Sequence, residues 1–437
     1  MISQIESIVK CAEQAGADEV EIFYVDGKVI SIDIERDEIS LAEKSIIRGV
    51  GIRASVDGAV GFSSTNDFTK VEEVIEHAVK YATIKSQDVS DWGGFPSNGK
   101  YPKVDGVFDK KLHDIGLDSC IDYAVKMIDG AKSVERAMPT SGNFVCSSST
   151  RTIYNSNGIM VRESGTIIEG SIDSVARDGD ISTASEFDIS RSLDIDFYQI
   201  GFNASDLANR SLNGIRIESG EVPVLLRPTA FAEIIGHALV PSLDADNVQK
   251  GRSALCGRLS TAIASEELDI IDNGLLAKGV GTAMMDDEGT PSQKIDIIVN
   301  GMLETFLYDC YTAGKDARKS TGNGVRRSYS SAPAVGIRNM TIQYPPTDII
   351  SETSHGILIN SVIGAHTANP VSGDFSVEAR NAFTIRDGSI CEPIKSLMLS
   401  GNVFELLKNI DGAGFDVRAV GNIITPTVRV SNQQVVG

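Results

Sequence analysis

The spacing of apolar residues at the start of the chain predicts one helix followed by paired strands. Apolar residues recur at helical spacing from Ile2 up to Gly16, a residue type that commonly ends a helix. Apolar and polar residues then alternate over 19–24 and 29–34, which is the period of a strand with one buried face. The Asp26-Gly27 pair between these two segments is typical of a hairpin turn, so we expect a hairpin there.

A second hairpin and two longer helices are predicted further along. The Asp57-Gly58 pair joins two strand-like segments, 46–54 and 60–63. Helical periodicity follows over 68–82 and again over 118–137. The first half of the chain is therefore expected to be an α+β domain with antiparallel hairpins.

The second half of the chain has a different pattern. A polar helix is expected over 204–212, followed by a strand over 222–226 and a helix over 231–239. Beyond that helix, short strand-like segments alternate with glycine turns. We therefore predict an α+β fold in two domains, with the hairpins in residues 1–203 and a β-rich domain in residues 204–437.

Length and composition are those of an ordinary globular protein. The 437 residues are 41% hydrophobic and 23% charged, and this length favours two domains. No apolar run approaches the roughly 18 residues that a membrane helix needs. Residues 1–6 lack the basic start of a signal peptide. We therefore expect a cytoplasmic protein without a membrane partner.

The charge and the cysteines argue against two classes of function. The net charge of −20 disfavours nucleic acid as a partner, because phosphate binding needs clustered Lys and Arg and the longest basic block is Arg326-Arg327. The six cysteines are scattered and form no CxxC pair. This spacing excludes a zinc ribbon and a thioredoxin-like redox motif.

The predicted helix over 231–239 carries the most informative polar pair. Its apolar residues form one stripe, and Glu233 and His237 lie four residues apart on the opposite side, where their side chains can touch. Such a pair is half of a metal site or, more commonly, an ion pair on a helix surface. Catalytic zinc needs three protein ligands and an open position for water, and one His with one Glu does not reach that number.

Two further segments carry candidate ligands. His366, which is followed by Thr-Ala-Asn-Pro, is a candidate third ligand. A lone histidine in such a setting more commonly lies in a turn or makes a local hydrogen bond. The acidic run 286–291 offers carboxylates for calcium or magnesium, but it lacks the ligand spacing of an EF-hand loop. We expect this run to be a solvated turn between strands.

Several ordered segments of the chain match one protein family. In the first half these are residues 16–21 and 49–54. In the second half they are residues 250–259, 286–291, 319–324, 368–376, 393–395 and 400–403. With these segments the chain resembles the TldD/PmbA family of metallopeptidases over nearly its whole length. The family is historically known as the modulators of DNA gyrase.

The resemblance also shows where this chain departs from the catalytic members. TldD-type chains carry HExxxH on a helix and a cysteine near the C-terminus as zinc ligands, whereas TldE (PmbA)-type chains lack this set. In this chain the first histidine is replaced by Ala232, and the cysteine position falls near Val420. Neither side chain has a lone pair for zinc, so we expect no metal and no cofactor in this chain. Glu233 would be a vestigial general base and His237 a vestigial ligand.

The function implied by the resemblance is that of a TldE/PmbA-type, non-catalytic subunit. It would pair with a TldD-type catalytic subunit that supplies zinc and cleaves unfolded or linear peptides. Its own metallopeptidase-like C-terminal domain would help to enclose the peptide substrate as an extended strand. Without its partner, the chain could form a homodimer.

Two alternatives stay open. The first is an active metallopeptidase in its own right, which uses His237 and Glu233 with His366 as a third ligand. The second is a binding module that modulates DNA or gyrase, as the historical family name suggests. The net charge of −20 opposes direct contact with DNA.

Overall fold

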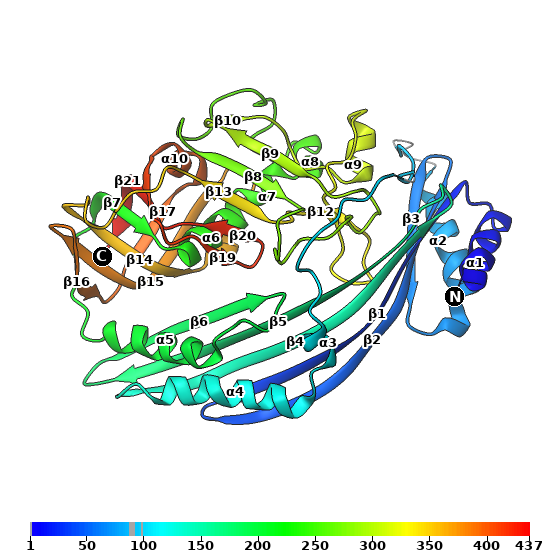
Figure 1. The fold of residues 1–437 in the computed structure, drawn as a ribbon. Helices are drawn as coiled ribbons and strands as arrows, with labels where there is room; N and C mark the ends of the chain where they lie inside the picture. Colours follow the sequence, from blue (N-terminus) through cyan, green and yellow to red (C-terminus); the bar gives the residue numbers. More distant parts are fainter. Residues whose placement is uncertain (1, 87–91, 98) are drawn as a thin grey trace.

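The chain folds into a long curved sheet with a β-rich lobe on its concave side (Figure 1). The computed structural model describes residues 2–86, 92–97 and 99–437. The N-terminal sheet has six antiparallel strands in the order β3-β2-β1-β4-β5-β6. They are β1 (Glu19–Glu35), β2 (Glu38–Val56), β3 (Ala59–Thr65), β4 (Ala137–Asn155), β5 (Met160–Arg177) and β6 (Ile181–Ser190). The helices of this half are α1 (Ile2–Gln14), η1 (Phe68–Lys70), α2 (Val71–Lys85), α3 (Lys110–Asp114), α4 (Leu117–Lys132) and α5 (Phe197–Arg210).

Alternate residues of the long strands divide this sheet into two faces. Ile22 of β1 packs with α1 and α2, and Ile32 of the same strand packs with α4 and α5, so these four helices cover one face. Residues of the other parity point to the opposite face. There Phe23 packs with Met285 and Glu21 pairs with Arg326, both from the C-terminal lobe. The strand period therefore places polar groups of the sheet against the lobe.

The first hairpin differs from the prediction. β1 runs through Asp26-Gly27 without interruption and turns only after Glu35, so the predicted turn at Asp26-Gly27 is wrong. Gly27 lies opposite Ser149 of β4, and a Cβ at Gly27 would lie 2.7 Å from the Ser149 Cβ. The glycine thus permits close approach of two strands instead of a turn. The hairpin at Asp57-Gly58 is present as predicted, with both residues at positive φ.

The C-terminal lobe contains two larger sheets. One has six strands in the order β10-β9-β8-β13-β20-β19; in the other, β14, β7, β21, β17 and β15 pair in a closed ring. The first sheet consists of β8 (Asp269–Asn273), β9 (Lys294–Val299), β10 (Met302–Leu303), β13 (Met340–Gln343), β19 (Arg418–Val420) and β20 (Ile423–Thr425). The second consists of β7 (Gly220–Leu226), β14 (His355–Ile363), β15 (Asp374–Arg386), β16 (Ser389–Ile394), β17 (Met398–Asn402), β18 (Ile410–Ala413) and β21 (Val428–Val436). A short pair joins β11 (Gly324–Val325) to β12 (Ala334–Val335).

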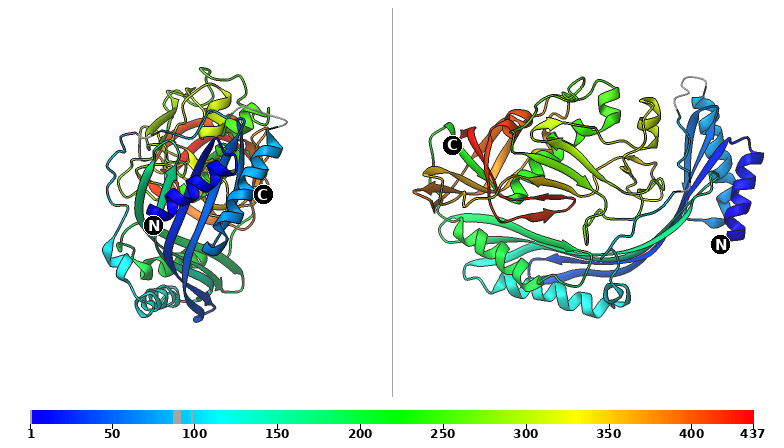
Figure 2. Two further views of the ribbon diagram at one scale, coloured as in Figure 1. Left: turned by 90° about the vertical axis from the view of Figure 1, so that its right-hand side faces the viewer. Right: turned by 45° about the horizontal axis from the view of Figure 1, so that its top comes forward.

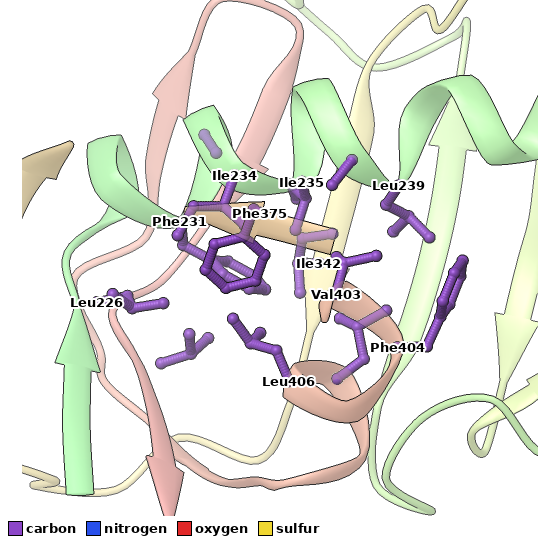
Figure 3. Close-up of a cluster of buried hydrophobic side chains, with 14 of the residues drawn as sticks. Leu226, Phe231, Ile234, Ile235, Leu239, Ile342, Phe375, Val403, Phe404 and Leu406 are labelled. Carbon is purple, nitrogen blue, oxygen red and sulfur yellow. The ribbon is translucent and has the colours of Figure 1, made fainter. Parts of the chain in front are cut away.

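One helix lies at the centre of the core of this lobe. The lobe's helices are α6 (Pro228–Ala238), α7 (Val240–Leu243), α8 (Ala245–Gln249), α9 (Cys310–Lys315), η2 (Ala365–Thr367) and α10 (Val403–Lys408). Figure 3 shows apolar side chains of α6, among them Phe231 and Ile235, pointing toward Phe375 of β15 and Leu406 of α10. The apolar stripe predicted for 231–239 is the face that α6 buries.

The predicted fold class is confirmed. The first half is an antiparallel sheet covered by helices, and the second half is rich in strands, which together make an α+β fold. The predicted division after residue 203 falls within α5, which packs against β5 and β6. The two ends of the chain lie at opposite ends of the molecule (Figure 2). None of the helices in the described ranges is long and apolar enough to cross a membrane.

Candidate functional site

The helix that matches the metallopeptidase motif is a regular α-helix. α6 follows β7 directly and begins at Pro228, a residue suited to the first helical position because it has no N–H to leave unbonded. The N–H of Leu239 still donates to the carbonyl of Ile235 at 2.9 Å, which is α-helical spacing. The segment 232–237 therefore has ordinary helical geometry.

Glu233 and His237 lie on the exposed side of α6. Their side chains are 45% and 46% exposed, and His237 Nε2 lies 3.7 Å from Glu233 Oε2. Ala232 is only 3% exposed and belongs to the core. On a regular α-helix, residues five apart point about 140° away from each other. Positions 232 and 237 consequently face in different directions, and Glu233 with His237 forms a surface pair that contributes little to stability.

A hairpin from the end of the chain lies beside α6. β19 and β20 both pack against this helix, and a Cβ at Gly236 would contact the Ile423 side chain at 3.4 Å. Val420, the last residue of β19, packs against the same core. The position that the resemblance assigns to the zinc-binding cysteine therefore lies next to the motif helix, but valine has no donor atom there.

The third candidate ligand, His366, lies on η2. This short helix also packs against α6, and the His366 side chain is exposed. Within residues 2–86, 92–97 and 99–437, no three His, Cys, Asp or Glu side chains come close enough together to hold one metal ion. The fold thus does not bring His366, Glu233 and His237 together as a ligand set.

A cavity of about 700 Å³ opens beside α6, between the two halves of the chain. β6 and β19 contribute to its lining, and each is the outer strand of its sheet. Arg418 of β19 reaches across to β6, where it donates to the Glu186 carboxylate and to the Phe187 carbonyl. Glu233 lies on the lining as well. The cavity therefore combines two strand edges with one of the two residues that remain from the motif.

The acidic run 286–291 is buried, which corrects the prediction of a solvated turn. Asp286 and Glu288 are fully buried, and Asp287 is 7% exposed. The run lies against the concave face of the N-terminal sheet, where Met285 packs with Phe23 of β1. Buried carboxylates need charged or hydrogen-bonding partners. Asp287 and Glu288 pair with arginines, whereas the oxygens of Asp286 accept backbone N–H groups.

These arginines form cross-strand pairs that the acidic run completes. Glu21 and Arg53 lie opposite each other on β1 and β2, and Arg53 Nη1 donates to Glu288 Oε1 at 2.7 Å. Arg151 of β4 lies opposite its partner carboxylate on β5 in the same way and pairs with Asp287. Neighbouring carboxylates of one loop thus join two separate strand pairs. We call Glu21, Arg53, Arg151, Glu163, Asp287, Glu288 and Arg326 the buried charge cluster.

Sequence reasoning missed the basic half of this cluster. Arg53, Arg151 and Arg326 stand far apart in the chain, and no local pattern marks them as partners of the acidic run. The available signal was the acidic run itself, because a dense set of carboxylates needs cationic partners once it is buried. Which arginines serve as partners follows from strand register, which links residues distant in sequence.

A pH-dependent stability is expected at the edge of the buried charge cluster. Asp309 caps the N-terminus of α9, and burial, together with the nearby Glu288 carboxylate, raises the pKa of Asp309 to about 6. The folded chain therefore retains a proton that the unfolded chain releases near pH 4, so this group lowers stability as the pH rises from about 4 to about 6. Asp309→Asn keeps a capping oxygen but cannot titrate.

Urea unfolding at about pH 4.5 and pH 7 measures this effect. The fall in the unfolding midpoint between the two pH values should be smaller in Asp309→Asn than in the parent chain. The matched control is Asp67→Asn, at the exposed N-cap of η1, where the hydrogen bond from Thr69 lowers the pKa of Asp67. Asp67→Asn should change the midpoint in the opposite direction. The ionised Asp67 stabilises the folded parent at the higher pH, so the variant should lose stability relative to the parent at pH 7. An unchanged pH profile in Asp309→Asn would contradict the raised pKa.

Comparisons with known proteins define the class to which this fold and site belong. Models of the PmbA/TldA metallopeptidase match the chain in three parts: domain 1 over residues 20–82, the central domain over 110–212 and the C-terminal domain over 219–437. The C-terminal model covers α6 and the β19–β20 hairpin. The fold and site are therefore those of the PmbA/TldA class of metallopeptidases, with its three consecutive domains.

Individual proteins agree with this assignment. The chain is 32% identical over 424 residues to an uncharacterised protein of Methanocaldococcus jannaschii, covering 97% of this chain and 98% of that one. It is 28% identical over 385 residues to a metalloprotease of Methanothermobacter thermautotrophicus, covering 85% and 82%. The crystal structure of TldE from Thermococcus kodakarensis superposes with a TM-score of 0.91 at 28% identity, covering 99% of this chain and 100% of that one. The chain belongs to the PmbA/TldD metallopeptidase family, as the resemblance predicted.

Proposed function

We propose that this chain is a TldE/PmbA-type non-catalytic subunit, which pairs in the cytoplasm with a TldD-type zinc metallopeptidase chain that cleaves unfolded or linear peptides. The observation that carries the proposal is the absence of donor atoms at two ligand positions, Ala232 and Val420. A catalytic zinc site needs three protein ligands, and of the expected set only His237 remains. The residues present do not fit zinc, so the metal and the chemistry belong to the partner. The likeness to TldE from Thermococcus kodakarensis supports this assignment.

The cavity beside α6 supports a role in holding the peptide. Outer strands carry backbone N–H and C=O groups that no neighbouring strand pairs, and an extended peptide binds to such an edge by strand addition. β6 and β19 both bring outer edges to the lining. Val417 and Ile363, which are 60% and 52% exposed, add apolar surface for peptide side chains. In this proposal the chain binds and orients the peptide while the partner cleaves it.

The surface near the cavity also supports pairing with another chain. Phe415 is 71% exposed and immediately precedes the cavity residues Asp416 and Val417 in sequence. A large apolar side chain held in water is commonly covered by a partner. A TldD-type chain that packs over Phe415 would close the cavity and bring its zinc to the peptide.

Metal analysis and a mixing experiment test the proposal. The purified chain is expected to hold no stoichiometric zinc and to leave casein, an unfolded substrate, intact. A TldD-type chain from the same organism should cleave casein faster when this chain is added, and Phe415→Ser should weaken that effect. Leu41→Ser, which changes a residue that is 50% exposed on β2, is the matched control.

The alternatives have distinct outcomes in the same experiments. Stoichiometric zinc that is lost in His237→Ala, together with peptidase activity of the chain alone, would establish an active metallopeptidase that uses His237 and Glu233. Salt-sensitive binding of the chain alone to duplex DNA would favour a modulator of DNA or gyrase. Either result would overturn the proposal of a non-catalytic subunit.

A further inference from the structure

A second, smaller cavity lies between the concave face of the N-terminal sheet and the C-terminal lobe. Its volume is about 210 Å³, and its lining shares no residue with that of the cavity beside α6. Three arginines from distant parts of the chain line it: Arg151 on β4, Arg191 just after β6, and Arg338 just before β13. We call it the arginine cavity.

The two carboxylates on the lining are both engaged elsewhere. Glu163 and Asp287 each pair with Arg151, and the Glu163 contact measures 2.7 Å. The second oxygen of Glu163 accepts the Met284 N–H at 2.7 Å, and the second oxygen of Asp287 accepts the Arg326 N–H at 2.8 Å. Arg151 is thus neutralised locally, and both oxygens of each carboxylate already accept a hydrogen bond from a group other than Arg191 and Arg338.

Arg191 has only neutral partners. Its guanidinium donates to backbone carbonyls, with Nε 3.3 Å from the Gly279 oxygen and Nη2 3.1 Å from the Thr282 oxygen. No carboxylate in the described part of the chain forms an ion pair with it. Burial, and then the neighbouring Arg151, lower the pKa of Arg191 to about 10, while the Glu163 carboxylate acts in the opposite direction, so Arg191 keeps its charge at neutral pH. A buried cation that is not directly paired with an anion is unfavourable.

Arg338 likewise donates to backbone carbonyls and forms no ion pair among the described residues. It is 6% exposed, and it donates to the carbonyls of Gly281 at 2.9 Å and Met285 at 3.3 Å. Asp272 and Asp286 are the other acidic groups near it, but the oxygens of both accept backbone N–H groups, and neither forms an ion pair with Arg338 within the ranges described. The cavity therefore faces two guanidinium groups that form no ion pair with any carboxylate of the described residues, although acidic groups lie near both of them.

We propose that the arginine cavity binds a small oxyanion, of the carboxylate or phosphate type, between Arg191 and Arg338. Nη1 of Arg338 and one N–H of Arg191 Nη1 donate to no described group, and such guanidinium N–H groups form strong charge-assisted hydrogen bonds to an oxyanion, which the low dielectric of a buried site strengthens. A volume of about 210 Å³ admits a small anion or the charged end of a longer ligand. The inference is independent of the proposed function, because the lining contains none of the motif residues.

The position of the site adds a consequence for stability. Arg191 belongs to the N-terminal half and Arg338 to the C-terminal lobe, so one anion would bridge the two halves. A ligand that binds only the folded chain raises the unfolding temperature with its concentration. The bound oxyanion should therefore increase the melting temperature of the full chain.

Titration of the full chain with defined anions tests the proposal. The probes are inorganic phosphate, acetate, the tripeptide Ala-Ala-Ala and its C-terminal amide, each compared with chloride at the same ionic strength. A rise in melting temperature and calorimetric binding with phosphate would identify a free anion as the ligand. Binding of the tripeptide acid without binding of its amide would identify a peptide terminal carboxylate. No response beyond that of chloride with any probe would overturn the proposal.

Variants distinguish a ligand site from a structural clamp. Arg191→Gln and Arg338→Gln should each weaken anion binding about tenfold or more, as loss of a charged hydrogen-bonding partner does. The matched control is Arg210→Gln on the surface of α5, whose side chain is 52% exposed; it should bind the anion like the parent. If Arg191→Gln does not fold, Arg191→Lys replaces it in the test. Lysine keeps the positive charge and should retain part of the affinity for the anion. Anion binding that persists in both glutamine variants would overturn the assignment.

Discussion

Arg53→Met is expected to lower the free energy of unfolding by about 3–5 kcal/mol, the usual cost of removing one partner from a buried ion pair. Arg53 is 3% exposed and bonds two carboxylates, Glu21 on the neighbouring strand and Glu288 from the C-terminal lobe. Its guanidinium also lies 4.9 Å from the centre of the Phe95 ring. Methionine fills a similar volume but leaves both carboxylates buried with one cation fewer. The loss should appear as a lower urea midpoint.

The matched control for this experiment lies on the same strand. Arg48 of β2 is 56% exposed and lies 3.5 Å from Asp26, so Arg48→Met should cost less than about 1 kcal/mol. A large loss in Arg53→Met with a small loss in Arg48→Met would locate the energy in the buried charge cluster. Equal, small losses would mean that Glu21 and Glu288 find other partners, and the cluster would then not hold the two halves together.

Ile235→Ala is expected to lower the free energy of unfolding by about 2–4 kcal/mol, as truncation of a core side chain does. Ile235 is fully buried on α6, in the cluster that Figure 3 shows between this helix, β15 and α10. The helix is packed on this face by several strands, so the space left by the lost atoms cannot collapse easily. Chemical denaturation of the variant and the parent measures the difference.

Glu233→Ala is the control on the opposite side of the same helix. Glu233 is 45% exposed, and among the described residues its nearest basic side chain is that of His237, 3.7 Å away, so the change should cost less than about 1 kcal/mol. An unfolded Glu233→Ala chain would mean that Glu233 is buried and that the packed face of α6 has been assigned the wrong way round. The comparison therefore separates the structural side of the helix from the side that faces the cavity.

Local patterns were sufficient for much of the secondary structure. The apolar stripe of α6 and the hairpin at Asp57-Gly58 depend on neighbouring residues, so the sequence predicted them correctly. The Asp26-Gly27 pair misled for the same reason. Gly27 is required because Ser149 of the neighbouring strand leaves no space for a side chain there, and no local pattern can reveal that contact.

The candidate site divides in the same way. The sequence alone showed that Ala232 and Val420 cannot ligate zinc, because the presence of a donor atom is a property of residue type. It also showed membership of the family, which the comparisons confirmed. That Ala232 is buried while His237 is exposed became certain only with the regular helix of α6 and its packing.

Only the tertiary structure decided which charged side chains are buried and which of them form ion pairs. The sequence determined that residues 286–288 are three consecutive acids, and an exposed turn was the simplest interpretation. Folding instead places these acids against the concave sheet, where Glu288 pairs with Arg53 and Asp287 with Arg151, two arginines that strand register has already set opposite other carboxylates. The same packing of the lobe on the sheet leaves Arg191 and Arg338 at a cavity without an ion pair among the described residues. Burial and ion pairing depend on which distant residues the fold brings within a few ångströms, and no local pattern in the chain encodes those distances.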